Sequence, residues 1–187
     1  MISEQQGQML LKMARISIAE KLGLSVDKSQ IDLNQSFLEI KQGLFVTLHK
    51  NGALRGCIGV IEAVEPLKTG VAEIARLAAF KDSRFAPLAR DEFDQVDLEI
   101  SLLSPPEKFE YSKAKELIQR LVPFKDGVII KKGSSQATFL PQVWEQLPDT
   151  ASFLSQLCTK AGLDADEWTK GSLTVHTYRV HLFCEKK

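Results

Sequence analysis

The chain has 187 residues, of which 44% are hydrophobic and 26% charged, as in an ordinary globular protein. Lys plus Arg and Asp plus Glu both number 24, so the formal net charge is zero. A general nucleic-acid or anionic-membrane binder normally carries a basic excess, so this balance argues against both classes. The N-terminus lacks a signal-peptide pattern, and no apolar run is long enough to span a membrane.

The three cysteines, Cys57, Cys158 and Cys184, are odd in number and widely spaced. That pattern argues against a disulfide framework and a structural zinc site, and is typical of a reducing cytosol. The three histidines are scattered. We therefore expect a cytoplasmic protein without a metal or a cofactor.

The first predicted element is a helix that begins after Ser3, because Ser3 and Gln6 have the spacing of a capping box. It ends near Gly23 and buries one apolar stripe, Leu11, Ala14, Ile18 and Leu22.

A β-hairpin over 43–60 comes next, with Asn51-Gly52 as its turn, since both turn positions must tolerate a positive φ. A two-residue loop pairs Lys50 with Ala53. Counting from there predicts further pairs: His49 with Leu54, Leu48 with Arg55, Val46 with Cys57 and Leu44 with Gly59. Arg55 and Cys57 then share one face of the sheet, and His49 lies on the other.

Gly56 and Gly59 are unusual inside a strand, which they weaken because they pack no side chain. Such glycines mark a bulge, or a place where another backbone or a ligand comes close.

The next predicted elements are a helix from Pro66 and a half-buried strand over 96–104 that ends at Pro105-Pro106. Their buried residues are Leu67, Val71, Ile74 and Ala78, then Val96, Leu98, Ile100 and Leu102. The second half begins with a short helix, after Ser112 to about Leu121. A second hairpin then turns at Gly133-Ser134-Ser135.

Two helices follow this hairpin, from Pro141 and from about Asp149, and the second ends with Gly162 as a left-handed cap and Leu163 as its apolar contact. We predict that Cys158 lies in the core on this helix. The last strand covers about 173–184, with Tyr178, Val180, Leu182 and Cys184 on one face.

The order hairpin, helix, strand therefore occurs twice, over 43–104 and 126–184. It predicts the α+β class, with two small, mostly antiparallel sheets flanked by helices. A crevice between the halves is the expected place for a site.

The residues Leu54-Arg55-Gly56-Cys57-Ile58-Gly59 resemble the LRGCIG signature of the AMMECR domain family, called AmmeMemoRadiSam system protein A in bacteria and archaea. The resemblance covers almost the whole chain. It continues through Ala79-Phe80 to Phe85, Gly127–Ile130, Phe139–Val143, Leu157-Cys158 and Lys160–Leu163.

This resemblance implies one domain of two strand-strand-helix-strand repeats that exchange their final strands, forming two interlocked subdomains. The larger is expected over about 1–92 plus 165–187, and the smaller over about 93–164. The activity of the family is unsettled. Its genomic association implies a Memo-like protein and a radical S-adenosylmethionine protein as partners.

Cys57 has three interpretations: a small buried hydrophobe beside a salt-bridged Arg55, a ligand contact, or a nucleophile. The guanidinium of Arg55 on the same face would lower the pKa of the thiol, but it supplies no general base. Asp82, Arg84 and Phe85 at the end of a helix are expected to pair with one another or with Arg55, or to contact a ligand. We predict the following candidate site, without a metal: Cys57 as the catalytic candidate, and Arg55, Gly56, Cys57, Gly59, Asp82, Arg84, Phe85 and Gln142 as ligand or partner contacts.

Two functions remain open. The chain is a cytosolic pathway or adaptor protein that binds a small molecule or a protein in the crevice around Arg55 and Cys57, or it is a thiol-dependent enzyme that uses Cys57. We expect the binding function.

Overall fold

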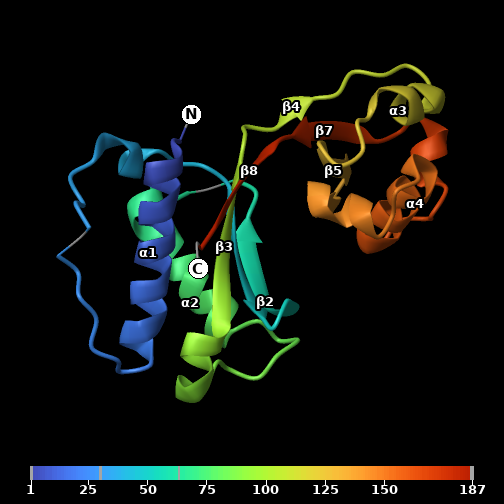
Figure 1. Ribbon diagram of the computed structural model, residues 1–187. Coiled ribbons are helices and arrows are strands. Elements are labelled where there is room, and N and C mark those ends of the chain that lie inside the picture. Colours follow the sequence, from blue (N-terminus) through green and yellow to red (C-terminus); the bar gives the residue numbers. More distant parts are fainter. Residues whose placement is uncertain (1, 30, 63, 186–187) are drawn as a thin grey trace. The chain divides into compact units, whose positions relative to one another are not determined.

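The computed structural model describes residues 2–29, 31–62 and 64–185 (Figure 1). The chain forms two compact units, one of Met1–Leu103 with His181–Lys187, the other of Ser104–Val180. The chain thus passes from one unit to the other at 103–104 and at 180–181, later along the sequence than the expected boundaries near 92 and 164.

The first unit is a four-stranded sheet in the order β2-β1-β3-β8, with two helices packed on it (Figure 1). Its elements are α1 (Glu4–Lys21), η1 (Ser36–Glu39), β1 (Leu44–Lys50), β2 (Ala53–Val60), α2 (Leu67–Phe80), η2 (Arg90–Gln95), β3 (Val96–Leu103) and β8 (Val180–Cys184). Ser3 forms the predicted capping box with Gln6. Pro66 is the N-cap of α2, one residue before its predicted place.

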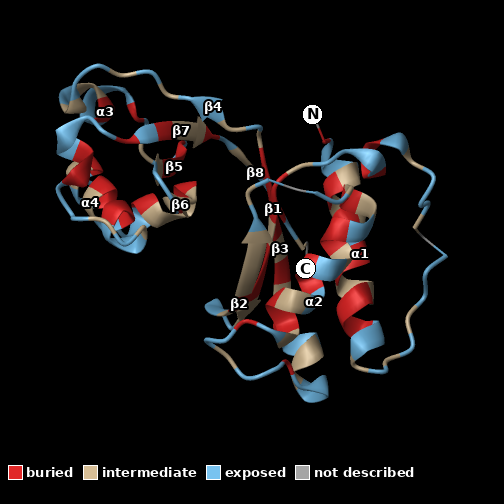
Figure 2. Cartoon of the chain, turned by 180° about the vertical axis from the view of Figure 1, so that it is seen from behind, coloured by how far each residue is buried: buried red, intermediate tan, exposed pale blue. Residues whose placement is uncertain are grey.

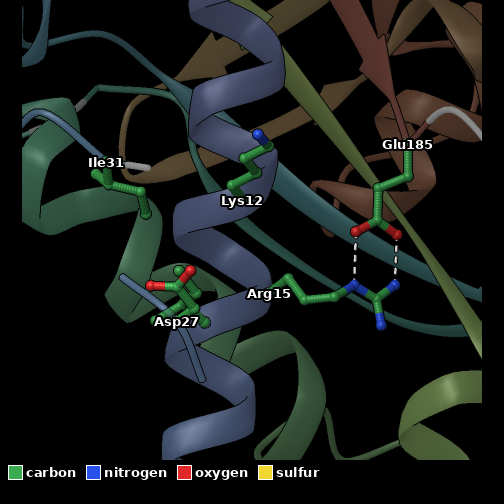
Figure 3. Close-up of a pocket in the computed structure, with 6 residues that line it drawn as sticks. Lys12, Arg15, Asp27, Ile31 and Glu185 are labelled. Atoms are coloured by element: carbon green, nitrogen blue, oxygen red, sulfur yellow. Dashed lines mark hydrogen bonds and ion pairs between the residues drawn. The ribbon is translucent and has the colours of Figure 1, made fainter. Parts of the chain in front are cut away.

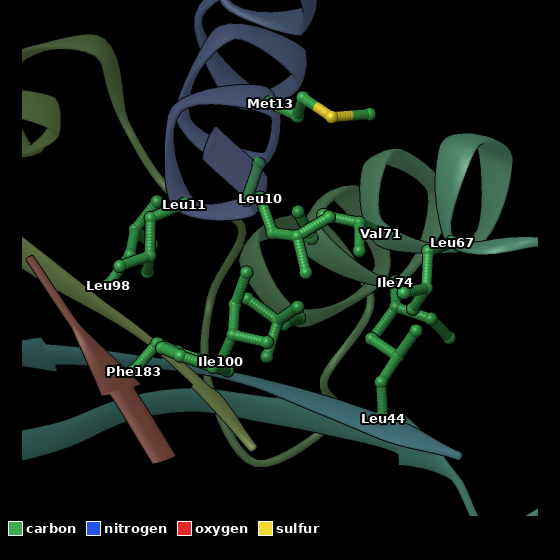
Figure 4. Packing of buried hydrophobic residues seen from close by; sticks show 14 of the residues in the cluster. Leu10, Leu11, Met13, Leu44, Leu67, Val71, Ile74, Leu98, Ile100 and Phe183 are labelled. Atoms are coloured by element: carbon green, nitrogen blue, oxygen red, sulfur yellow. The ribbon is translucent and has the colours of Figure 1, made fainter. Parts of the chain in front are cut away.

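The core of this unit lies between the helices and the sheet, where the buried faces meet (Figure 2). Buried side chains from α1, α2, β1, β3 and β8 interdigitate there, and Ile58 of β2 packs against them. Figure 4 labels Leu10, Leu11 and Met13 of α1, Leu67, Val71 and Ile74 of α2, and Leu44, Leu98, Ile100 and Phe183 of the strands. Phe183 lies against Gly7, where an added Cβ would come within 2.0 Å of the ring. The ring of Phe183 in β8 therefore packs directly on the backbone of α1 at Gly7, where any side chain would clash with it.

The second unit is also a four-stranded sheet with helices, in the order β4-β7-β5-β6. Its elements are β4 (Glu107–Lys108), α3 (Ala114–Arg120), β5 (Gly127–Lys132), β6 (Ser135–Phe139), η3 (Pro141–Glu145), α4 (Thr150–Lys160), η4 (Glu167–Lys170) and β7 (Thr174–Tyr178). Its core is centred on Trp144, stacked on Phe153 with ring centroids 3.7 Å apart, and includes Cys158 as predicted. Gly162 adopts the expected positive φ of 73°.

The final segment differs from the single strand predicted over 173–184. It breaks at Arg179, so that β7 joins the second sheet and β8 the first. The predicted face of Tyr178, Val180, Leu182 and Cys184 is wrong, because the break changes the alternation: Phe183 is buried, whereas Leu182 is 42% exposed. The segment over 96–108 behaves in the same way, with β3 in the first sheet and β4 in the second. The α+β class with two sheets is confirmed.

No helix within the described residues combines the length and the apolar character needed to cross a lipid bilayer.

Candidate functional site

The hairpin of β1 and β2 contains a bulge that the sequence analysis missed. Asn51 and Gly52 have the expected positive φ values, 52° and 77°, and Lys50 pairs with Ala53. The register then shifts by one residue at Arg55, so that Gly56 lies opposite Leu48 and Cys57 opposite Thr47. The predicted pairs Leu48–Arg55, Val46–Cys57 and Leu44–Gly59 are therefore wrong.

The hydrophobic pattern explains the bulge. Leu44, Val46 and Leu48 all face the core, so the predicted register would have placed Arg55 there with them. A one-residue shift moves every later side chain to the other face. It brings Gly56 and Ile58 to the core side and turns Cys57 away from it.

Gly56 is required by the backbone of α2. A Cβ at this position would lie 2.3 Å from the carbonyl oxygen of Ala78, near the end of α2. At Gly59 the corresponding space is filled by the ring of Phe45, 2.2 Å from an added Cβ. The close approach predicted for these glycines is thus made by the chain itself.

Asp82 and Arg84 bind the backbone N–H and carbonyl groups of Cys57 at the free edge of β2. The Cys57 N–H donates to Asp82 Oδ2 at 2.9 Å, and Arg84 Nη2 donates to the Cys57 carbonyl oxygen at 3.2 Å. Arg84 also donates from Nε to Asp82 Oδ1 at 2.9 Å and from Nη2 to Oδ2 at 2.7 Å. Together, Asp82, Arg84 and the backbone N–H and carbonyl groups of Cys57 form what we call the edge clamp.

The edge clamp occupies hydrogen-bonding groups that an edge strand otherwise offers to another chain. Asp82 is only 6% exposed, and its hydrogen bonds from Arg84 hold the pKa of its carboxyl well below the usual range. The expected pairing of Asp82 with Arg84 is confirmed.

Arg55 forms its own ion pair, with Glu92 of η2. Its Nε and Nη2 donate to the two Glu92 oxygens at 3.1 and 2.8 Å, and Lys50 Nζ donates to Oε1 at 3.0 Å. These bonds, chiefly that of Arg55, lower the pKa of Glu92 to about 2. The ring of Phe85 stands near two guanidinium carbons, at 6.0 Å from that of Arg55 and 5.5 Å from that of Arg84.

The Cys57 thiol is half-buried and is not activated by its surroundings. Burial raises its pKa, and the nearby Asp82 and Glu99 carboxylates add to this; the Thr47 hydroxyl, which donates to Sγ at 3.3 Å, and Arg84 oppose it. The expectation that Arg55 lowers the pKa of Cys57 is wrong, because the Arg55 guanidinium is ion-paired with the Glu92 carboxylate. A higher pKa means less thiolate at neutral pH, so the site favours contact over nucleophilic attack.

His49 lies on the same face as Thr47, because the two are two residues apart in a strand whose register with β3 is regular. The prediction that His49 and Cys57 occupy opposite faces is therefore wrong, for the same reason as the register. The hydrogen bond that Sγ receives nevertheless comes from Thr47.

The other predicted site residue, Gln142, is half-buried in η3 of the second unit. Its binding role stays a prediction, as does the crevice between the halves.

Sequence reasoning missed Glu92 and Thr47. The spacing of Glu92 from Ala89 was the available signal for the first: Glu92 Oε2 accepts the Ala89 N–H at 3.1 Å, as in a helix start.

A second feature of the first unit is a cavity of about 270 Å³ beside α1, lined by Lys12, Arg15, Ile16, Asp27, Ile31 and Glu185 (Figure 3). Arg15 forms a bidentate ion pair with Glu185 and also donates to the carbonyl oxygens of Phe93 and Val96 at 2.9 and 2.7 Å. Since its donors serve the fold in this way, Arg15 joins α1 to β8 and β3. Among the described residues, no group of three or more His, Cys, Asp or Glu side chains is placed to hold a metal.

Comparison with known proteins places this geometry in a family. The model of the AMMECR1 family matches residues 11–183. A protein of Methanothermobacter thermautotrophicus is 36% identical over 98% of this chain and 96% of its own length, and one of Saccharolobus solfataricus is 37% identical over 100% and 84%. A crystal structure of an uncharacterised protein from Pyrococcus horikoshii matches with a TM-score of 0.87 and 33% identity, over 99% of this chain and 94% of that one. The chain therefore belongs to the AMMECR1 family.

Proposed function

We propose that this member of the AMMECR1 family is a pathway or adaptor protein that binds a protein partner at the surface of Cys57, Arg84 and Phe85, where the buried Asp82 holds Arg84 in place. The observation that carries the proposal is the edge clamp: the charged groups beside Cys57 hold its backbone and not its sulfur. A nucleophilic cysteine needs a neighbour that stabilises the thiolate, whereas here burial raises the pKa of the thiol.

Exposed side chains along this surface suit protein recognition. The Arg84 side chain is 55% exposed even though it holds Asp82, and it lies beside the ring of Phe85. On β2, Leu54, which pairs with His49 on the same face as Cys57, is 42% exposed. Arginine and aromatic side chains on a preformed support are common among residues that dominate binding energy. The edge clamp fixes Arg84 in advance, which lowers the entropy that binding must overcome.

The resemblance names the partners to test first, a Memo-like protein and a radical S-adenosylmethionine protein. A cytoplasmic location belongs to the same proposal, because unpaired, scattered cysteines are typical of a reducing compartment.

Isothermal titration calorimetry of the purified chain with each of these two proteins from the same source tests the proposal. We expect Phe85→Ala and Arg84→Ala to weaken binding at least about tenfold, and Arg90→Ala, an exposed arginine of η2, to leave it unchanged. Thermal melts identify any variant whose loss reflects unfolding. Unchanged affinity in both site variants would contradict the proposed surface. Loss of affinity on Cys57→Ser together with fast alkylation of the parent thiol would instead favour the thiol enzyme.

A further inference from the structure

A short loop of the second unit, residues 122–126, is closed by hydrogen bonds between its ends. The Val122 N–H donates to Asp126 Oδ2 at 2.6 Å, and the Asp126 N–H donates to the Val122 carbonyl oxygen at 3.0 Å. Asp126 is itself only 5% exposed and forms an ion pair with Arg179 at 3.0 Å, and its carbonyl oxygen accepts the Trp144 indole N–H at 2.8 Å. The loop therefore has fixed ends on the core of the unit.

The middle of this loop presents an aromatic ring to solvent. Phe124 has a φ of 63°, a conformation that glycine adopts freely and that a bulky residue rarely adopts. Phe124 is 59% exposed, and two apolar residues close to it in the sequence, Ile118 of α3 and Val122, are 43% and 39% exposed. We call Ile118, Val122 and Phe124 the apolar knob. Glycine would relieve the backbone, so the ring at this position is not explained by the fold of the loop.

Basic residues flank the apolar knob in the sequence. The segment over 113–125 contains four basic residues and one acidic residue, in a chain whose formal net charge is zero. Within the part of the chain that the structure describes, the Lys113, Lys115 and Lys125 ammonium groups form no ion pair. The acidic residue, Glu116, is engaged locally: it accepts the N–H groups of Ser112 and Lys113 at 3.3 and 3.1 Å.

We propose that the apolar knob and its lysines dock a short acidic segment of a partner protein. Apolar side chains of that segment would cover Ile118, Val122 and Phe124, while its carboxylates face the three unpaired lysines. A second copy of this chain is a less suitable partner, because a two-fold contact would bring the three lysines of one copy close to the same lysines of the other. The inference concerns a surface of the second unit and does not depend on the proposed role of Cys57.

The test uses two fluorescein-labelled 16-residue peptides with leucine and phenylalanine at helical spacing, one with glutamate at the other positions and one with lysine. Binding to the full chain is measured by fluorescence anisotropy and located by NMR shifts of the ¹⁵N-labelled protein. We expect the acidic peptide to bind, to shift the amides of 115–125, and to bind at least about tenfold more weakly to Phe124→Gly and to Lys115→Glu with Lys125→Glu. Val64→Ala, which trims a residue 77% exposed in the first unit, is the matched control and should change nothing.

Phe124→Gly separates recognition from folding, because glycine accepts the positive φ. We expect this variant to melt at or above the temperature of the parent while losing the peptide. Equal binding of both peptides, unchanged binding to Phe124→Gly, or no binding of the acidic peptide up to about 1 mM would overturn the proposal. So would Phe124-dependent binding to phosphatidylserine vesicles or Phe124-dependent self-association in sedimentation.

Discussion

Glu92 joins η2 to both strands of the first hairpin, and its neutral substitute should show how much this ion pair stabilises the first unit. Glu92→Gln keeps the size of the side chain and removes the charge that faces Arg55 and Lys50. The fall of the pKa from 4.5 to about 2 corresponds to about 3 kcal/mol at 1.36 kcal/mol per pKa unit. The side chains of Arg55, Lys50 and Glu92 are 13%, 30% and 18% exposed, so solvent screening reduces this to about 1–2 kcal/mol.

The sign of the pH dependence follows from the lowered pKa. A carboxyl with a depressed pKa in the folded state contributes stability above its unfolded pKa and loses it as the pH falls through the folded value. The difference in unfolding free energy between the parent and Glu92→Gln should therefore be constant from pH 7 to pH 5. It should then shrink as the pH falls from about 4.5 towards about 2.

Urea unfolding at several pH values measures this difference, and thermal melts at pH 7 should show a drop of about 2–8 °C. Glu39→Gln is the control, since Glu39 is 64% exposed and 3.8 Å from its partner Lys68; it should cost less than about 0.5 kcal/mol. A loss in Glu92→Gln no larger than in the control, or a loss of full size at pH 3, would refute this reasoning.

Two further predictions concern the backbone around Cys57. Gly56→Ala should destabilise the protein by about 2 kcal/mol or more in urea unfolding, because its Cβ would meet the Ala78 carbonyl oxygen at 2.3 Å. Gly70 lies inside α2, and a Cβ there would be 3.6 Å from the side chain of Leu44, so Gly70→Ala should instead stabilise the protein by about 0.5–1 kcal/mol. An unchanged free energy of unfolding in Gly56→Ala would contradict the close contact between Gly56 and Ala78. Asp82→Asn should lower the free energy of unfolding by about 1–3 kcal/mol, because it breaks the ion pair with Arg84 in the edge clamp. The control Asp94→Asn changes an exposed residue and should be neutral. Equal melting temperatures of the two variants would argue against the clamp.

The sequence predicted local features well wherever one residue type decides the geometry. Asn51-Gly52, Ser3 with Gln6, and Gly162 each form the turn or cap expected, since positive φ and capping depend on few residues. The stripe on α2 and the alternation in β3 also lie in the core as predicted, because the period of burial fixes which side chains face inward.

The missed features depend on contacts between distant parts of the chain. A turn sequence determines only the strand pairs next to it. The bulge at Arg55 places Ile58 on the core side of the sheet and places Gly56, which has no side chain, against the backbone of α2. The packing of Phe183 on α1 depends on Gly7, which is far from it in the sequence. The partner of Arg55 could be assigned only once η2 was placed beside the hairpin.

The central claim, that Cys57 is a contact residue and not a nucleophile, is tested most directly by the rate at which iodoacetamide alkylates it. The measurement is made on a Cys184→Ser background, which removes the exposed thiol, while Cys158 is fully buried. Mass spectrometry of the labelled peptide follows Cys57 from pH 6 to pH 10. We predict alkylation slower than that of free cysteine at pH 7, with a midpoint at a higher pH than that of free cysteine, because burial raises the pKa of the thiol. Alkylation faster than free cysteine with a midpoint below that of free cysteine would contradict the claim.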